Sequence, residues 1–555
     1  MSSVSGFDIF VLCAYFACIA AAGIWFARRN TSTEHYFLGS RNFPAWAIGL
    51  SMVGTSISSV SYLAYPGDAF KTAYLRLLPA FMLPIAILIA SYFFLPFFRR
   101  GKVTSAFEYL EGRFGPYTRV YAAVAFVIMQ LLRLSTVLYL VSVLVFELIL
   151  GIAGAEYLAS VFGENYQAIV QYLSVVLAGI FVSFYTVLGG IEAVVWTDVA
   201  QTIVLIGGGI LCLGVIVWQL PGGFGQIISQ ASEAGKFSFS DLNLETGLVE
   251  DPEWAFTFYR RTALMMLVIG LANWLMEYSS NQNIVQRYCA SRSAKDARRA
   301  MWICCWTSIP LWTFFMFLGT ALWVYFQQFP TETSEMMLRG DLSAEQVLPH
   351  FILIGLPVGL GGLLVAAVLA AAMSTLDSSL NAISTVSVTD IYKRHLYPGR
   401  ADTHYLMAAR IIAIVSSVFM VLGAFGFVYA QQAGAMKTMQ DTSVILAALT
   451  SGGLLGLYMF GFFTKLGDDR ALITAILVTI LFNIYRTADF MGWLPGFMNI
   501  GVIDVLDHYY TGVLGHVLVF VAAYIVSMFV RKFFDTPERD LTNLTVWTQD
   551  GKPLD

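Results

Sequence analysis

The sequence predicts an all-α polytopic membrane protein, and three observations lead to that prediction. Of 555 residues, 58% are hydrophobic and only 12% are charged, whereas a water-soluble protein carries about 25% charged residues. The hydrophobic residues gather in runs long enough for membrane helices, which need about 20 apolar residues each. Lysine and arginine concentrate in alternate connections between these runs. The lipid bilayer is therefore the expected surrounding of most of the chain.

About 13 apolar runs are long enough to be transmembrane helices. If the N-terminus lies outside, the inner segments hold most of the 32 lysines and arginines, so the tail at 531–555 is expected in the cytoplasm. The protein is accordingly expected to be a multi-pass protein of the plasma or inner membrane. One membrane domain over 1–555 is expected, with extra C-terminal helices at 466–530. The runs fall at 7–27, 44–66, 75–98, 118–150, 168–188, 191–219, 257–285, 300–326, 350–390, 406–429, 440–464, 470–490 and 510–530.

Charge and ligand patterns exclude several function classes. The 32 basic residues are outnumbered by 36 acidic ones, so no basic excess exists to bind phosphates and nucleic acid is not an expected partner. The six histidines are scattered, without the paired spacing of zinc or di-iron ligands. No nucleophile–base pair or metal motif appears, and we therefore do not expect an enzyme.

The second predicted span is interrupted at its centre. It reads WAIGLSMVGTSISSVSYLAYPGDAF, and residues 54–59 contain one large apolar side chain among glycine and hydroxyl residues. Small and hydroxyl residues let a membrane helix unwind, because they satisfy the backbone groups that unwinding frees. Close helix packing through small residues is the alternative explanation.

The ninth predicted span carries a stripe of oxygen-bearing side chains. Its members recur at helical spacing, and Asp377 is three residues from the second of them. Hydroxyl, carbonyl and carboxylate oxygens suit a small hard cation rather than zinc or copper. The alternative is a polar face that lines a packed bundle. The stripe consists of Ala371, Ser374, Thr375, Ser378 and Asn381.

Two charged residues lie deep within predicted spans. Asp198 is in the sixth span and Arg133 is in the middle of the fourth. A charge in this position indicates a functional site by default, because it is costly unless it is paired or hydrated. For both residues a fixed structural partner remains an alternative.

The seventh predicted span is interrupted as well, by the polar stretch NWLMEYSSNQN at 273–283. Interruptions at corresponding positions of two halves point to a transporter built from inverted repeats. This inference rests on position, because the two halves share no obvious sequence identity.

At this point the chain resembles the sodium:solute symporter family over about residues 8–465, the group of sodium–glucose, iodide, proline and sialic-acid transporters. Three segments carry the resemblance, and together they are specific: Tyr185-Thr186…Gly189-Gly190…Ala193-Val194-Val195-Trp196-Thr197-Asp198…Gln201; Asn281-Gln282…Val285-Gln286-Arg287; and Met373-Ser374-Thr375…Asp377-Ser378…Asn381…Thr389-Asp390-Ile391-Tyr392.

The resemblance implies a LeuT-like fold, with an extra first helix and inverted five-helix repeats over spans 2–6 and 7–11. It also implies a shared Na⁺ site, with carbonyls and hydroxyls from Gly54, Ile57, Ala371, Ser374 and Thr375. Some members hold a second sodium, which here would lie among Asp198, Ser374, Asp377 and Ser378. Asp377 occupies a position that is often a hydroxyl residue in the family.

The resemblance also bears on the transported small molecule. The galactose-binding residues of the sodium–galactose members are not preserved, since Ser61 and Trp274 stand in their places. Arg133 matches an arginine that contacts the substrate carboxylate in bacterial sialic-acid transporters, and Ser56, Ser58 and Ser61 fit the neighbouring hydroxyl positions. A guanidinium binds a carboxylate with two hydrogen bonds.

We therefore expect a sodium-coupled symporter that imports a carboxylated or polyhydroxylated solute, such as sialic acid, by alternating access. A sodium-coupled neutral sugar or polyol symporter is the alternative within transport. A membrane sensor that keeps the fold without turnover is the alternative from another class.

Overall fold

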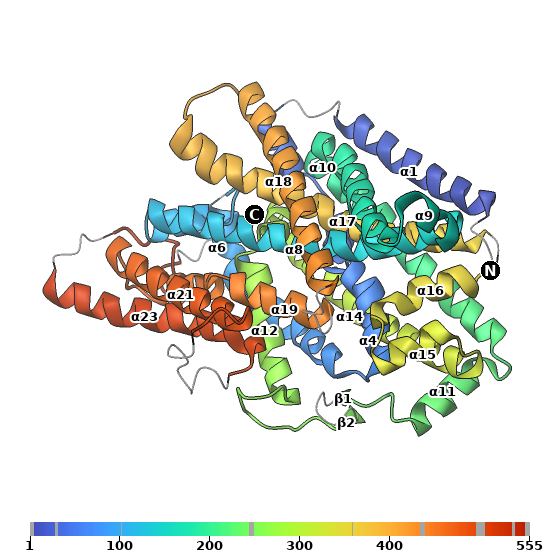
Figure 1. Cartoon of the computed structure of the whole chain (residues 1–555). Helices are drawn as coiled ribbons and strands as arrows, with labels where there is room; N and C mark the ends of the chain where they lie inside the picture. The colour runs from blue at the N-terminus through green and yellow to red at the C-terminus, as the bar shows by residue number, and fades with distance from the viewer. Residues whose placement is uncertain are drawn as a thin grey trace.

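The computed structural model describes residues 5–27, 32–101, 103–242, 249–357, 359–432, 439–495, 506–534 and 539–549. Side chains are described for these residues apart from a few stretches, one of which, 184–189, includes the Tyr185-Thr186 pair of the resemblance. The chain is a bundle of long helices, with a small two-stranded pairing of β1 (Asp241–Leu242) and β2 (Val249–Glu250) at one end (Figure 1).

The helices of the first half run from α1 to α11. They are α1 (Gly6–Ala27), α2 (Thr33–Leu38), η1 (Gly39–Arg41), α3 (Ala45–Ser56), η2 (Val60–Ala64), α4 (Tyr65–Lys71), η3 (Leu75–Met82), α5 (Leu83–Ile89), η4 (Ala90–Phe94), α6 (Leu95–Arg100), α7 (Glu108–Arg113), α8 (Pro116–Ala153), α9 (Ala155–Phe162), α10 (Tyr166–Gln219) and α11 (Gly223–Glu233).

The helices of the second half run from α12 to α23. They are α12 (Ala263–Ser279), α13 (Gln282–Ala290), α14 (Ala294–Gln328), α15 (Glu332–Arg339), η5 (Ala344–Gln346), α16 (Val347–Ile354), α17 (Leu360–Val386), η6 (Ser387–Leu396), α18 (Asp402–Gln432), α19 (Met439–Thr450), α20 (Leu454–Phe463), α21 (Asp469–Phe490), η8 (His508–Tyr510) and α23 (Thr511–Phe533).

Both predicted interruptions are breaks in the structure. The helix pair that contains α3 and α4 bends by 60°, and the pair α12 and α13 bends by 51°. The second break occurs at Asn281, which has extended backbone angles and whose side chain accepts a hydrogen bond from the backbone N–H of Asn283. The amide side chain thus satisfies a group that the break frees.

The number of spans differs from the expected thirteen. Within the described residues, ten helices are long and apolar enough to cross a membrane, and the two bent pairs bring the number to twelve. The predicted span at 440–464 is divided into α19 and α20, because Gly452 and Gly453 both have left-handed backbone angles (φ 62° and 69°). The predicted span at 350–390 is likewise divided, into α16 and α17, by a turn with Gly359 at φ 93°.

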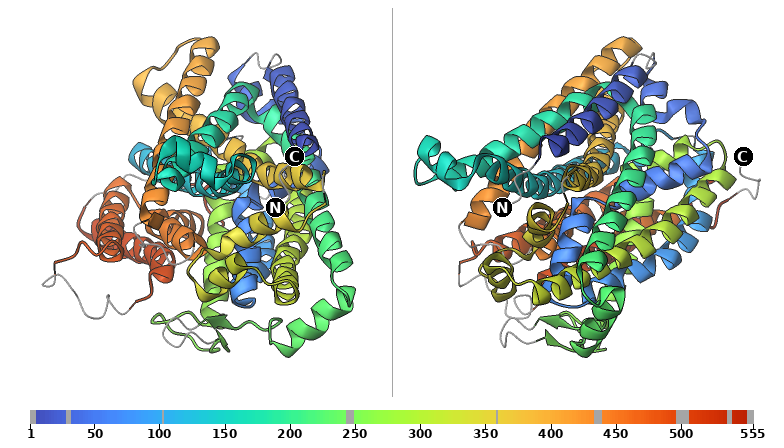
Figure 2. Two further views of the ribbon diagram at one scale, coloured as in Figure 1. Left: turned by 45° about the vertical axis from the view of Figure 1, so that its right-hand side comes forward. Right: turned by 90° about the vertical axis from the view of Figure 1, so that its right-hand side faces the viewer.

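Helix α17 lies at the centre of the bundle, and 83% of its most apolar window is buried. It packs against α10, α8, α1 and α3. The C-terminal helices α21 and α23 pack together at the edge of the bundle, on the side away from α1 (Figure 1 and the left view of Figure 2). The fold therefore brings the oxygen-rich stripe of α17 against both the broken helix and the helix of Asp198.

The broken pair α3 and α4 also rests closely on α14. At Gly319 of α14, an added Cβ would lie 2.1 Å from the carbonyl oxygen of Pro66 in α4. At Gly49 of α3, an added Cβ would lie 2.7 Å from the side chain of Ile303 in α14. Small residues at helix crossings let backbones approach this closely in membranes, so both halves of the broken helix are in tight contact with α14.

Candidate functional site

The break after α3 exposes backbone carbonyls to α17. Helix α3 ends at Ser56, and the next residue, Ile57, is fully buried with extended backbone angles (φ −100°, ψ 99°). Gly54 is at the closest approach, since an added Cβ there would lie 2.9 Å from Thr202 Oγ1 and 3.4 Å from Ser374 Cβ. A larger residue at 54 would force α3 away from α10 and α17.

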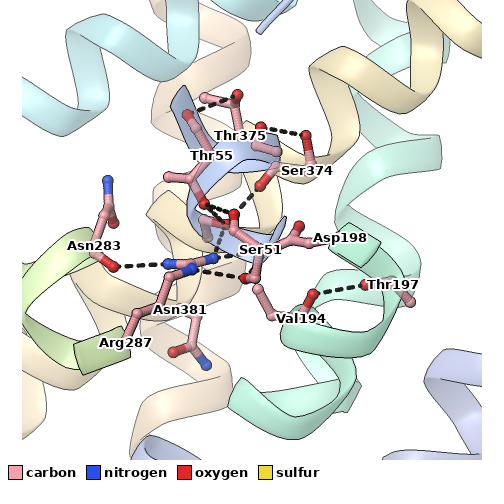
Figure 3. A network of polar contacts seen from close by, with 12 residues as sticks. Ser51, Thr55, Val194, Thr197, Asp198, Asn283, Arg287, Ser374, Thr375 and Asn381 are labelled. Atoms are coloured by element: carbon pink, nitrogen blue, oxygen red, sulfur yellow. Dashed lines mark hydrogen bonds and ion pairs between the residues drawn. The ribbon is translucent and has the colours of Figure 1, made fainter. Parts of the chain in front are cut away.

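Of the residues predicted to bind the shared sodium, Ser374 and Thr375 lie beside this break (Figure 3). Ser374 Oγ is 2.7 Å from the carbonyl oxygen of Gly54 and 3.1 Å from that of Ala371, so its proton can be donated to either. Thr375 Oγ1 is 3.5 Å from the Ala371 carbonyl oxygen and donates to the carbonyl of Thr55 at 3.4 Å. The structure thus brings Gly54, Ala371, Ser374 and Thr375 together, with Ile57 at the adjoining turn.

Asp198 in α10 forms a buried ion pair with Arg287 in α13. Arg287 Nη2 lies 2.8 Å from Asp198 Oδ2, and these side chains are 1% and 0% exposed. Ser51 Oγ donates to the same carboxylate oxygen at 2.6 Å and accepts from Arg287 Nε at 2.8 Å. Arg287 also donates to the hydroxyl of Ser378 and to the carbonyl of Asn283. This network joins α3, α10, α13 and α17 (Figure 3).

Not all polar atoms of this region are satisfied within the described residues. Asp198 Oδ1 and both side-chain polar atoms of Gln201 are buried without a hydrogen bond. The Tyr15 hydroxyl of α1 lies beside Gln201 and within the electrostatic influence of Asp377, which is 1% exposed. Buried polar atoms of this kind are rare in native proteins and mark places for an ion or water. The oxygens among these atoms, Asp198 Oδ1 and Gln201 Oε1, fit a hard cation such as Na⁺.

The predicted substrate residues share one cavity of about 320 Å³ beside the break. Ser56, Ser58, Ser61 and Arg133 all line it. Two of the hydroxyls already accept hydrogen bonds, Ser58 from the N–H of Val60 and Ser61 from Trp312 Nε1, each at 3.2 Å. Such hydroxyls can still donate to a ligand, because the bonds they make use only their oxygen lone pairs.

Arg133 faces the cavity with 31% of its side chain exposed. Its Nη1 lies 3.7 Å from Glu277 Oε1 of α12, and its Nη2 donates to the carbonyl of Thr55 at 3.3 Å. Trp274, at the place of the galactose-binding asparagine, lines the same cavity and donates from Nε1 to the carbonyl of Pro79 at 2.9 Å. Arg133 therefore has both a carboxylate partner and access to a ligand, the two alternatives that its sequence position left open.

Two residues of the site were not predicted as members of it. Arg287 falls in a segment whose arginines and lysines were assigned to the inner membrane surface, yet it is buried. Glu277 was one polar residue among several in the interrupted seventh span. The available signal was charge balance, because each intramembrane charge at 133 and 198 requires an opposite charge nearby.

A model of the sodium:solute symporter family matches residues 36–477. The sodium/sialic acid symporter SiaT of Proteus mirabilis is 30% identical over 472 residues, which cover 85% of this chain and 87% of that protein. The sodium/sialic acid symporter NanT of Aliivibrio fischeri is 26% identical and covers 96% of this chain and 95% of its own length. The sodium/glucose cotransporter of Vibrio parahaemolyticus is 27% identical, with 87% and 85% covered.

Solved structures give the same fold. The substrate-bound, outward-open structure of a Na⁺-coupled sialic acid symporter superposes with a TM-score of 0.77 at 27% identity, covering 96% of this chain and 99% of that one. A nucleobase-cation-symport-1 family transporter, 13% identical, superposes with a TM-score of 0.51 and supports the fold alone. The predicted LeuT-like architecture is confirmed by these neighbours.

Proposed function

Because the chain belongs to the sodium:solute symporter family, we propose that its substrate is a small carboxylated, polyhydroxylated solute, with sialic acid as the leading candidate. The protein is a sodium-coupled symporter and not an enzyme. The observation that carries the substrate class is Arg133, whose guanidinium faces a cavity that also holds the hydroxyls of Ser56, Ser58 and Ser61. The two sialic acid symporters among the relatives support the same choice.

Arg133 and the three serines have separate roles in this proposal. A guanidinium presents two parallel N–H donors that match the two oxygens of a carboxylate. The serine hydroxyls lie on the break and can exchange hydrogen bonds with substrate hydroxyls. A neutral sugar would use the serines but not the charge of Arg133, and this difference separates the proposal from a neutral sugar or polyol symporter.

The shared sodium binds at the break in this proposal. The carbonyls of Gly54, Ile57 and Ala371 and the hydroxyls of Ser374 and Thr375 supply its five ligands. A chain of contacts of 3.5 Å or less links four of these residues, from Gly54 through Ser374 and Ala371 to Thr375. A cation held there joins the broken helix to α17, and its arrival or departure changes the energy of separating them.

A second sodium would lie near Asp198, with Ser374, Asp377 and Ser378 beside it. The unbonded Asp198 Oδ1 supports this position. Arg287 competes for the same carboxylate, since it bonds Oδ2 at 2.8 Å. Asp377 brings a second carboxylate, which offsets that positive charge.

Coupling follows from the linkage of the two binding equilibria. If sodium raises the affinity for substrate, substrate raises the affinity for sodium by the same factor. When both are bound, the protein rocks to expose the cavity on the other side of the membrane. Release of sodium into a low-sodium cytoplasm then weakens the hold on the substrate.

We further propose that the N-terminus lies outside and the C-terminal tail inside, as the positive charges predict. Residues 539–549 of the tail pack on the ends of α7 and α20, where Tyr109 Oη donates to the Leu544 carbonyl and the Val546 N–H donates to the Phe462 carbonyl. A cysteine introduced at exposed Trp547 should react with a membrane-impermeant thiol reagent only after the cells are opened.

The substrate proposal is tested by uptake into proteoliposomes. Radiolabelled sialic acid should accumulate only with an inward sodium gradient, and unlabelled glucose should not compete. Sodium-driven accumulation of glucose without any effect of sialic acid would overturn the substrate class and favour the neutral sugar alternative. Sodium-dependent accumulation of any solute dismisses the non-transporting sensor.

A further inference from the structure

Glu277 is the carboxylate nearest to the proposed substrate-binding arginine in the described part of the cavity. It lies on the last turn of α12, just before the break at Asn281. The Glu277 side chain is 13% exposed and lines the cavity. At 3.7 Å its Oε1 is near enough to Arg133 Nη1 for an ion pair but too far for a hydrogen bond. The arginine is thus neutralised without a tight carboxylate contact.

The rest of the Glu277 carboxylate is fixed by the break itself. Its Oε2 accepts a hydrogen bond from Asn281 Nδ2 at 2.7 Å. Asn281 Oδ1 in turn accepts from Gln130 Nε2 at 3.3 Å and from the N–H of Asn283 at 3.0 Å. Because Asn281 is held by two donors, Glu277 is held in place and its Oε1 remains directed to the cavity.

A substrate carboxylate that binds Arg133 changes the surroundings of Glu277. The two carboxylates would then lie on the same guanidinium, and Glu277 would lose part of its counter-charge while mostly buried. A carboxylate in that position needs hydrogen-bond donors, because an unsatisfied buried charge is more costly than a weakly solvated neutral group. A substrate with hydroxyl or N–H groups can supply those donors, and a plain hydrocarbon acid cannot.

We propose that Glu277 is a specificity-determining residue, which accepts hydrogen bonds from hydroxyl or N–H groups of the substrate while the substrate carboxylate occupies Arg133. The cavity therefore selects acids that carry donors over monocarboxylates that lack them. This inference rests on the proposed function, since it assumes that the substrate carboxylate binds Arg133.

The same arginine connects the cavity with the proposed sodium ligands. The carbonyl of Thr55 accepts from Arg133 Nη2 at 3.3 Å and from Thr375 Oγ1 at 3.4 Å. If a substrate carboxylate draws Arg133 away from Thr55, the Thr55 carbonyl keeps, of these two hydrogen bonds, only the one from the Thr375 hydroxyl. Glu277, by setting where the guanidinium lies, acts on both sites.

The test uses two acids with the same ring, quinate with its four hydroxyls and cyclohexanecarboxylate with none, as competitors of sodium-driven sialic acid uptake. In the unaltered protein, quinate should compete about tenfold better or more, the range expected for donors to a charged acceptor. In Glu277→Gln the preference for quinate over cyclohexanecarboxylate should shrink about tenfold, because the neutral amide carries no charge that needs hydrogen-bond donors from the ligand. Glu277→Asp, which keeps the charge, should retain most of the preference.

A matched control is Glu253→Gln, which removes a carboxylate from an exposed arginine pair outside the cavity. It should leave the ratio unchanged. If the ratio is unchanged in Glu277→Gln while sodium-dependent uptake is intact, the role of Glu277 is overturned but the proposed function is not. Uptake of a neutral sugar with no competition from either acid would overturn the proposed function and this inference with it. If Glu277→Gln does not fold, equal competition by the two acids in the unaltered protein overturns the inference by itself.

Discussion

Arg287 and Arg133 each face a carboxylate from another helix, but the two pairs have different surroundings. Arg287 and Asp198 are 1% and 0% exposed and 2.8 Å apart, whereas Arg133 and Glu277 are 31% and 13% exposed and 3.7 Å apart. Arg287 also bonds Ser51, Asn283 and Ser378, while Arg133 donates a hydrogen bond to one backbone carbonyl.

The difference separates a structural pair from a binding pair. A buried ion pair in which every guanidinium nitrogen is hydrogen-bonded can be broken only at a large cost, because removal of one partner leaves an uncompensated charge. An arginine at a cavity wall with a distant partner can exchange that partner for a ligand. In the proposed function, the same residue types therefore serve helix packing at one site and recognition at the other.

The largest effect is expected for Arg287→Met. It leaves Asp198 buried without its counter-charge, which costs about 3–5 kcal/mol of stability. The melting temperature of the purified protein in detergent should fall by many degrees. The double variant Arg287→Met with Asp198→Asn should recover part of this loss. If Arg287→Met melted like the unaltered protein, the pair could not be called structural.

Arg133→Ala should give the second largest effect, on binding rather than on folding. Loss of a charged hydrogen-bonding partner in a partly buried site costs about 2–5 kcal/mol, so affinity for sialic acid should fall about 100-fold or more. Melting without ligand should change little, in contrast to Arg287→Met. Normal uptake of sialic acid by Arg133→Ala would remove Arg133 from the site.

A smaller effect is expected from the proposed sodium ligands. Ser374→Ala and Thr375→Ala each remove one of five oxygens, and each should raise the sodium concentration for half-maximal uptake about tenfold. The control is Ser384→Ala on the same helix, whose buried hydroxyl donates to the carbonyl of Leu380 one turn earlier. Unaltered sodium dependence in both Ser374→Ala and Thr375→Ala would contradict the assignment.

The smallest effect concerns a buried cation held by carbonyls instead of a carboxylate. Lys236, in the connection between α11 and β1, donates to the carbonyls of Ala69, Phe70 and Thr72. Burial lowers the pKa of Lys236 to about 8, and the charge of Asp68 opposes this shift only in part.

Between pH 8 and the unfolded pKa near 10.5, the folded protein has lost this proton while the unfolded chain still binds it. Stability should therefore rise with pH in that window, by about 1.4 kcal/mol per pH unit at most, and be unaffected by this group below it. The melting temperature of the unaltered protein, taken relative to that of Lys236→Met, should rise from pH 8 to pH 9.5. A relative melting temperature that falls over this range would contradict the lowered pKa.

The parts of the site that local patterns predict are the breaks and the oxygen stripe. Residues 54–59 predicted the first break because glycine lets the helix unwind and hydroxyl side chains satisfy the freed backbone groups nearby. The face of α17 that contacts the break followed from helical spacing alone.

The partners of the intramembrane charges did not follow from local patterns. Arg287 is 89 residues from Asp198, and Glu277 is 144 residues from Arg133, so only the tertiary fold brings them together. Charge balance predicted that Asp198 and Arg133 have oppositely charged partners, but it could not identify the partner residues. The expected count of about thirteen spans is not confirmed within the described residues, because the glycines at 452 and 453 divide an apolar run whose composition is continuous.

The close contact of Gly319 with Pro66 has a practical consequence for following the transport cycle. An opening between α4 and α14 would first have to break this contact, so the two helices should travel together when the protein rocks. Two spin labels on these helices would keep a constant separation in every state. The distance between such a pair serves as an internal reference. Distances from this pair to labels on α10 or α17 then report how far those helices move.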